Sequence, residues 1–163
     1  MSGSTNSPAH SLTVTTPTAR EIHIERIFDA SREYVWRAFT EPDLLVQWWG
    51  RGNKLVIEQF DLEPGGRWRF VEHGPDGARG FQGHYREVAP QERIVWTFAR
   101  DGAAGQMSVN TVLFEDLGDG RTRVINDVTF QTQEERNATL QYGIDGGLKP
   151  TYAALDALLE KLD

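Results

Sequence analysis

The chain has 163 residues, no cysteine, and a formal net charge of −7 from 17 basic and 24 acidic side chains. This length suits one domain, which can bury a sizeable core without a covalent crosslink. The lack of cysteine excludes disulfides, thiol catalysis and thiolate metal sites, and it favours a cytoplasmic protein. The acidic balance, with no basic run, disfavours nucleic acid and anionic membranes as partners. No apolar run approaches the roughly eighteen residues that a membrane span requires.

Residues 1–19 are rich in Ser, Thr and Pro and show no sustained apolar period. They lack the charged start and the apolar core of a signal peptide. This composition predicts a disordered N-terminal tail, followed by a single domain over residues 20–163.

The domain is predicted to begin with one strand and two short helices. Glu21 to Phe28 alternates between apolar and polar residues, as a half-buried strand does. Asp29 or Ser31 can cap a first helix, and Pro42 suits the first turn of a second. Residues 31–49 should therefore form two short helices.

Six further strands are predicted from alternation and from the turn residues between them. The Gly, Pro and Asp residues at their ends supply the backbone angles of tight turns. Because the connections are too short for crossovers, all seven strands should be antiparallel. The six are Leu55–Leu62, Arg67–His73, Gly80–Val88, Arg93–Arg100, Ser108–Asp116 and Arg121–Phe130.

The last thirty residues predict a long amphipathic helix over residues 132–162, because apolar residues recur there in steps of three and four. Thr132 and Glu135 form a capping box at its start. Pro150 cannot donate to the carbonyl of Gly146, so we expect a kink or short break over residues 146–150. The bend is interpreted either as a detail of packing or as the roof of a cavity.

The expected fold class is α+β. An antiparallel sheet with one apolar face must bury that face, and the terminal helix is the only long apolar partner that the chain offers. We therefore predict a seven-stranded, strongly curved sheet that wraps around this helix, with the two short helices closing one end.

Seven short segments in this chain form a characteristic ordered set. They are Phe28-Asp29-Ala30, Val35-Trp36, Trp48-Trp49-Gly50, residues 61–68, Gly74-Pro75-Asp76-Gly77, Glu92-Arg93-Ile94-Val95 and residues 143–147. Together they resemble the SRPBCC superfamily, whose helix-grip fold is shared by START domains, birch-pollen-allergen-like proteins and polyketide cyclases. The resemblance is closest to the branch named after activators of the 90-kDa heat-shock chaperone's ATPase, and it covers about residues 20–162.

This resemblance implies a hydrophobic cavity between the sheet and the terminal helix that binds a small apolar or lipid-like molecule. Two alternatives follow from other relatives. The namesake proteins bind the 90-kDa heat-shock chaperone, using this domain as one of two, and the sequence in hand holds only this one. A minority of relatives use the cavity for cyclase or hydrolase chemistry.

The side-chain inventory favours a binding protein over an enzyme. Outside the tail the serines are Ser31 and Ser108, and neither lies in a nucleophile elbow. The four histidines form no pair at metal-binding spacing, so we expect no metal site and no cofactor. His84 should point away from the apolar face of its strand. We therefore assign no catalytic residue.

The candidate binding residues are mostly aromatic side chains on the predicted inner face of the sheet, where they could line a pocket or simply fill the core. Asn126 lies on this face and would either bond within the protein or anchor a ligand. One of the paired tryptophans at positions 48 and 49 should seal the core, and the other should line the cavity mouth. Arg26 could pair with a carboxylate of the protein or of a ligand. The full candidate set is Trp48, Trp49, Trp68, Phe70, Tyr85, Trp96, Phe98, Phe114, Asn126, Ile144 and Leu148.

Overall fold

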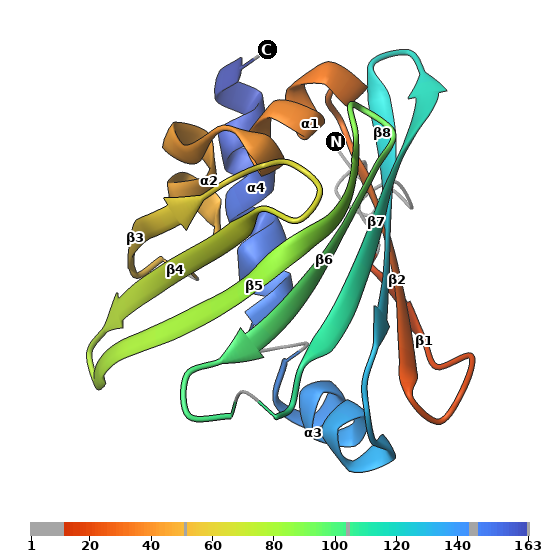
Figure 1. Ribbon diagram of the computed structural model, residues 1–163. Helices are drawn as coiled ribbons and strands as arrows, with labels where there is room; N and C mark the ends of the chain where they lie inside the picture. The colour runs from red at the N-terminus through yellow and green to blue at the C-terminus, as the bar shows by residue number, and fades with distance from the viewer. Residues whose placement is uncertain (1–11, 51, 104, 144–146, 163) are drawn as a thin grey trace.

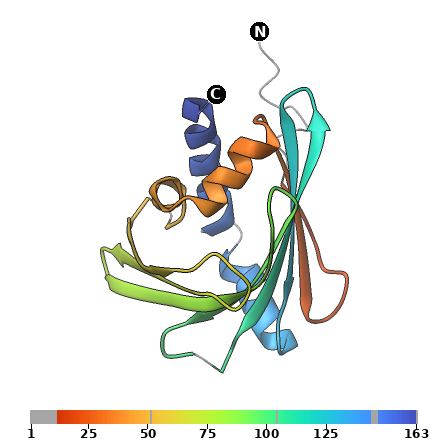
Figure 2. The same ribbon diagram turned by 45° about the horizontal axis from the view of Figure 1, so that its top comes forward.

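The structure is a computed structural model that describes residues 12–50, 52–103, 105–143 and 147–162 (Figure 1). Within these ranges an antiparallel sheet of eight strands curls around one long helix, α4, in the order β1-β2-β8-β7-β6-β5-β4-β3. Helices α1 and α2 lie against α4 at one end of the sheet, and α3 lies at the other end (Figures 1 and 2). The elements are β1 (Thr13–Thr15), β2 (Glu21–Phe28), α1 (Arg32–Thr40), α2 (Pro42–Trp48), β3 (Lys54–Phe60), β4 (Arg67–Gly74), β5 (Gly77–Ala89), β6 (Arg93–Arg100), β7 (Ser108–Gly118), β8 (Arg121–Thr129), α3 (Gln133–Gly143) and α4 (Lys149–Leu162).

The structure confirms the predicted helix-grip architecture, including both short helices and all seven predicted strands, but it adds an eighth strand. Residues 13–15, which we assigned to a disordered tail, form β1 and pair with residues 23–25 of β2. The tail prediction is therefore wrong for this segment. A three-residue edge strand with one apolar side chain, Val14, is too short to produce a recognisable alternation, and its conformation depends on its pairing with β2.

The predicted helix over residues 132–162 is divided in the structure into α3 and α4. Thr132 caps α3 as expected, because its Oγ1 accepts the amide hydrogen of Glu135 at 3.1 Å. A π-helical turn at residues 147–148 precedes α4, and Pro150 lies in the first turn of α4, where its missing amide costs little. The predicted break thus falls at the junction between α3 and α4. Residues 144–146, in this junction, lie outside the described part of the chain.

Helix α4 is fixed to β2 by an aromatic contact and a partly buried ion pair. The rings of Phe28 and Tyr152 meet edge to face, with their centroids 5.3 Å apart. The Arg26 guanidinium donates to both carboxylate oxygens of Asp156 at 2.7 and 2.6 Å and lies over the Phe28 ring. The carboxylate that pairs with Arg26 therefore belongs to the protein. Leu155 of α4 is also fully buried, and a buried leucine side chain stabilises the fold by about 1.5–3 kcal/mol.

The ladder between β5 and β6 is interrupted near its centre. The flanking pairs are Gln82 with Ala99 and Tyr85 with Trp96, and the register shifts just beyond them, between Tyr85 and Glu87. Between these pairs, side chains supply the hydrogen bonds. The indole of Trp68 donates to the carbonyl of Thr97 at 3.0 Å, and the amide of His84 donates to the hydroxyl of the same threonine at 2.9 Å.

The interrupted part of this ladder leaves no room for a side chain at position 83. A Cβ atom at Gly83 would lie 1.9 Å from the carbonyl oxygen of Thr97 and 2.8 Å from Nε1 of Trp68. Such distances do not occur between real atoms, so glycine is required here because the two backbones approach each other closely. The close approach of β5 to β6 at this position therefore requires glycine.

Candidate functional site

One row of side chains crosses the inner face of the sheet through directly paired residues. Tyr85 pairs with Trp96, Trp96 with Asn110, Asn110 with Val128, and Val128 with Ile22. Directly paired residues of an antiparallel sheet point to the same face. Ile22 and Tyr85, at the two ends of the row, are buried, whereas the three residues between them are only partly buried.

The adjacent row is more fully covered, except at one polar residue. Ile94 and Val112 are each 1% exposed beneath the helices, and Val112 pairs in turn with Asn126. Asn126 is partly buried, and its side-chain oxygen Oδ1 is buried without any hydrogen-bond partner. A buried acceptor left unpaired costs about 1–3 kcal/mol. The oxygen thus makes no hydrogen bond within the described part of the chain, and the role of Asn126 as an anchor for a ligand stays a prediction.

We call the partly buried part of this surface the open inner face. It consists of Trp96, Phe98, Asn110, Asn126 and Val128. Leu140 of α3 and Leu148 of the π-helical turn are also partly buried and pack against the core. The open inner face is therefore a mainly apolar surface with two amides.

The other candidate aromatic residues are divided between the core and the edge of this surface. Trp48, Trp68, Phe70 and Phe114 are at most 4% exposed and fill the core. Trp48 seals it as expected of one member of the pair, since its indole donates to the carbonyl of Ala38 at 2.8 Å.

Trp49 is only partly buried and contacts the rings of Phe70 and Phe81 edge to face, at 5.4 and 5.2 Å. Phe81 stacks on Phe98 of the open inner face at 5.5 Å. Trp49 is thus joined to that surface through one intervening ring, and its role at a cavity mouth stays a prediction.

The last two predicted binding residues lie near the break before α4, and two residues of the open inner face were not predicted. Ile144 lies outside the described residues, and Leu148 lies in the turn that precedes α4. Asn110 and Val128 belong to the open inner face but were not among the candidates. The alternation that placed Phe114 inward also places Asn110 inward, four residues earlier, so the sequence contained this signal.

Burial raises the pKa of two inner tyrosines, whose phenols are neutral at pH 7 in any case. It raises the pKa of Tyr152 to about 12, although the nearby Arg26 acts in the opposite direction. Burial also raises the pKa of Tyr85 well above its ordinary value. Both phenols therefore remain protonated at neutral pH, and Tyr85 brings no charge to the end of the row that leads to Trp96 and Asn110.

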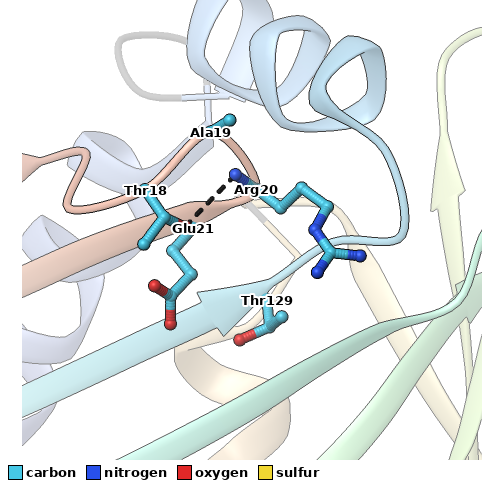
Figure 3. A pocket seen from close by; sticks show the side chains of 5 residues that line it. All are labelled: Thr18, Ala19, Arg20, Glu21 and Thr129. Carbon is cyan, nitrogen blue, oxygen red and sulfur yellow. Dashed lines mark hydrogen bonds between the residues drawn. The ribbon is translucent and has the colours of Figure 1, made fainter.

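Two shallow depressions lie on the described surface. One, of about 370 Å³, is lined by Thr18, Ala19, Arg20, Glu21 and Thr129 at the turn between β1 and β2 (Figure 3). The other, of about 210 Å³, is lined by Leu12, Arg26, Lys149, Tyr152 and Ala153 beside the start of α4. Of the residues considered for ligand binding only Arg26 lines one of them, and its guanidinium already binds Asp156, so neither depression carries the candidate site.

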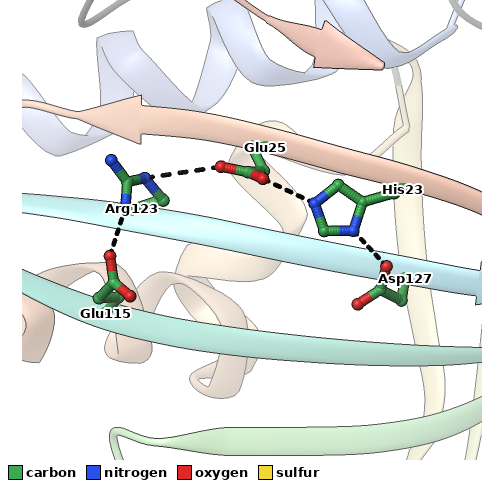
Figure 4. Close-up of polar contacts among 5 residues, drawn as sticks. All are labelled: His23, Glu25, Glu115, Arg123 and Asp127. Atoms are coloured by element: carbon green, nitrogen blue, oxygen red, sulfur yellow. Dashed lines mark hydrogen bonds and ion pairs between the residues drawn. The ribbon is translucent and has the colours of Figure 1, made fainter. Parts of the chain in front are cut away.

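A polar chain crosses the outer face of β2, β8 and β7 (Figure 4). The His23 ring contacts Glu25 through Nε2 at 2.7 Å and Asp127 through Nδ1 at 2.5 Å. Arg123 continues the chain, with ion pairs to Glu25 at 3.6 Å and to Glu115 at 2.6 Å. The hydrogen bond to Glu25, together with the contacts to Asp127, raises the pKa of His23 despite its partial burial.

We predict that this histidine makes stability depend on pH. Because the folded pKa is raised above the unfolded value near 6.5, the stabilisation is complete below that value and is lost as pH rises through the folded pKa. His23→Gln should therefore cost about 0.5–1 kcal/mol of unfolding free energy at pH 6. The cost should shrink as the pH rises.

Urea unfolding of both proteins from pH 5.5 to 9 measures this difference. His73→Gln is the control, because His73 is exposed at the end of β4. A His23→Gln cost that is the same at every pH would contradict the prediction.

The described helices include none that is long and apolar enough to cross a membrane. Among the residues placed in the structure, no three His, Cys, Asp or Glu side chains gather closely enough to hold a metal ion.

Comparisons with known proteins give one family and many structural neighbours. A family profile described as "Activator of Hsp90 ATPase homolog 1-like protein" matches residues 29–160. A crystal structure from Rhodobacter sphaeroides is 26% identical, with a TM-score of 0.84, and the match covers 94% of this chain and 100% of that one. A solution structure from Arthrobacter aurescens is 24% identical, with a TM-score of 0.81 and coverage of 94% and 92%. No functionally curated protein gave a significant match.

Proposed function

Because the chain belongs to the family of Activator of Hsp90 ATPase homolog 1-like proteins, with the helix-grip fold of the SRPBCC superfamily, we propose that it binds a small, largely apolar molecule on the open inner face. The observation that carries this proposal is the contrast within the inner face. Side chains under α1 and α4 are fully buried, whereas Trp96, Phe98 and Val128 are only partly covered beside an unpaired amide oxygen of Asn126.

The chemistry of the surface supports a ligand of this type. Binding sites for small molecules are mostly apolar and aromatic, with a few polar groups that fix the orientation of the ligand. Trp96 and Phe98 supply the apolar area, and the two amides supply the polar groups. A ligand that covers a partly exposed indole or phenyl ring removes apolar surface from water, and this burial favours binding by about 25 cal/mol per Å².

A titration with 2-methylnaphthalene, followed by backbone NMR shifts, tests the proposal. We expect shifts at residues 96–98, 108–112 and 126–128, and Trp96→Ala should weaken binding about tenfold, since an aromatic contact is worth about 0.5–1.5 kcal/mol beyond the area that it buries. Trp36→Ala is the matched control, because that ring packs on Phe114 from α1. Shifts confined to the outer face, or equal losses in both variants, would contradict the proposal.

A second candidate function comes from the description of the family. A protein related to activators of the 90-kDa heat-shock chaperone's ATPase could bind that chaperone, and its net charge of −7 would require a basic surface on the partner. The chaperone's ATPase rate with and without this protein distinguishes the two functions. An unchanged rate at excess protein counts against the second.

A cyclase- or hydrolase-type reaction remains the third alternative. The five side chains of the open inner face contain two amides, an indole, a phenyl ring and an isopropyl group, and therefore no nucleophile and no general acid or base.

A further inference from the structure

We propose that Asn110 and Asn126 form a paired amide anchor that selects an uncharged ligand carrying a hydroxyl group on an aromatic or alicyclic body. This inference rests on the proposed function and specifies the ligand that the open inner face would take. It follows from the position of the two amides, from the missing partner of Asn126, and from the charges on the described inner face.

The two asparagines are diagonal neighbours on adjacent strands. Asn126 of β8 pairs with Val112 of β7, and Asn110 lies two residues before Val112 on that strand. Both side chains therefore point to the inner face, and diagonal positions lie about 7–8 Å apart, within reach of one small group placed between them. Apolar residues surround the pair, because Trp96 and Val128 flank Asn110 and Ile24 pairs with Asn126.

The unpaired oxygen indicates what the ligand must supply. Oδ1 of Asn126 is a buried acceptor, so a ligand group that donates a hydrogen bond would remove an existing penalty as well as form a bond. A hydroxyl group can donate to this oxygen and also accept from the amide of Asn110. A site built around such a group discriminates strongly against the analogue that lacks it, since the protein's polar atom then stays unpaired.

The charges around the site favour a neutral ligand over a carboxylate. Two guanidinium nitrogens of Arg26 already donate to the carboxylate of Asp156, so they are not available to a carboxylate on the ligand. The phenol of Tyr85 is uncharged at pH 7, and burial raises its pKa further. The chain as a whole carries a net charge of −7, which repels anions.

Three probes of similar size separate these contributions: 2-naphthol, 2-methylnaphthalene and 2-naphthoate. Their dissociation constants for the full chain at pH 7 can be measured by NMR titration. We expect 2-naphthol to bind about 3–10 times more tightly than 2-methylnaphthalene, because its hydroxyl group forms one additional hydrogen bond with the protein. We expect 2-naphthoate to bind more weakly than either.

Two substitutions then test the asparagines themselves. Asn126→Leu should abolish the preference for 2-naphthol while 2-methylnaphthalene still binds. The same change should raise the Tm by about 2–4 °C, because a side chain whose buried oxygen has no partner is replaced by an apolar side chain of similar size. Asn110→Leu should reduce the preference as a second, independent variant. Thr111→Val changes an outer-face residue of β7 and is the control. It should alter neither the preference for 2-naphthol nor the Tm.

The outcomes separate the anchor from the function on which it rests. If both naphthalenes bind at the open inner face with equal affinity, or if Asn126→Leu weakens them equally, the anchor is wrong and the proposed function stands. A Tm lowered by Asn126→Leu would show that the amide serves the fold, and it would also overturn the anchor. If neither neutral probe binds, both proposals fail.

Discussion

Gly83→Ala is expected to lower the unfolding free energy by about 4 kcal/mol, and the Tm by roughly 10 °C. The new methyl group would occupy the same space as the carbonyl oxygen of Thr97, so β5 and β6 must separate. Separation also breaks the hydrogen bond from Trp68 to that carbonyl and leaves a buried donor unpaired. Overpacking and the lost bond therefore act together.

Urea unfolding of Gly83→Ala measures this effect, with Gly105→Ala as the control. A Cβ at Gly105 would meet no atom within 4 Å, so that change should stay within about 0.5 kcal/mol. If both variants unfold at the same urea concentration, position 83 tolerates a side chain and the argument from close approach is wrong.

Asp156→Leu is expected to cost about 3 kcal/mol of unfolding free energy, the lower part of the range for breaking a buried ion pair. The Arg26 side chain is 9% exposed and would lose both of its charge-assisted hydrogen bonds to the carboxylate. Asp156 itself is 35% exposed, so solvent reduces the penalty. The double variant Arg26→Met/Asp156→Leu should recover most of the loss, because no charge then remains buried.

A second arginine–aspartate pair provides the comparison. Arg69 binds both oxygens of Asp101 at 2.9 and 2.8 Å, but the pair lies on the surface. Asp101→Leu should therefore cost much less than Asp156→Leu. Equal costs for the two aspartate variants, or a double variant no more stable than Asp156→Leu, would contradict a special role for burial.

Alternation of apolar and polar residues was sufficient to place most of the sheet. The limits of β2 and β6 agree with the prediction at both ends, because each strand has one face against the core and turn residues at its ends. The strand β1 could not be found in the same way, since its position depends on a ladder with β2 and hardly at all on its own composition.

The division of the terminal segment was predicted only in part. Pro150 and the nearby glycines indicated a break, but helical periodicity continues across residues 132–162, and it cannot show that α3 and α4 are separate helices. Periodicity indicates which residues share one face of a helix. It gives no information on the orientation of a second helix that follows a break.

The candidate site shows a similar limit. Aromatic composition pointed to the inner face, but it could not distinguish rings that fill the core, such as Trp68 and Phe70, from rings that stay partly uncovered, such as Trp96. That difference depends on which parts of the sheet the helices cover. The inward position of Asn126 was predicted from the sequence, whereas the missing partner of its side-chain oxygen depends on the packing of the surrounding strands.

The pairing of β2 with β8 sets the order in which the chain can fold. All the other ladders of the described sheet join strands that are neighbours in sequence, so they can form by short loop closures. Strand β2 is synthesised long before its partner, and closing that loop carries a larger entropic cost. Until β8 emerges, Ile22, Ile24 and Phe28 have no neighbouring strand along that edge of the sheet. A chain interrupted before Arg121 would lack both β8 and α4 and would keep this apolar row exposed until synthesis is complete.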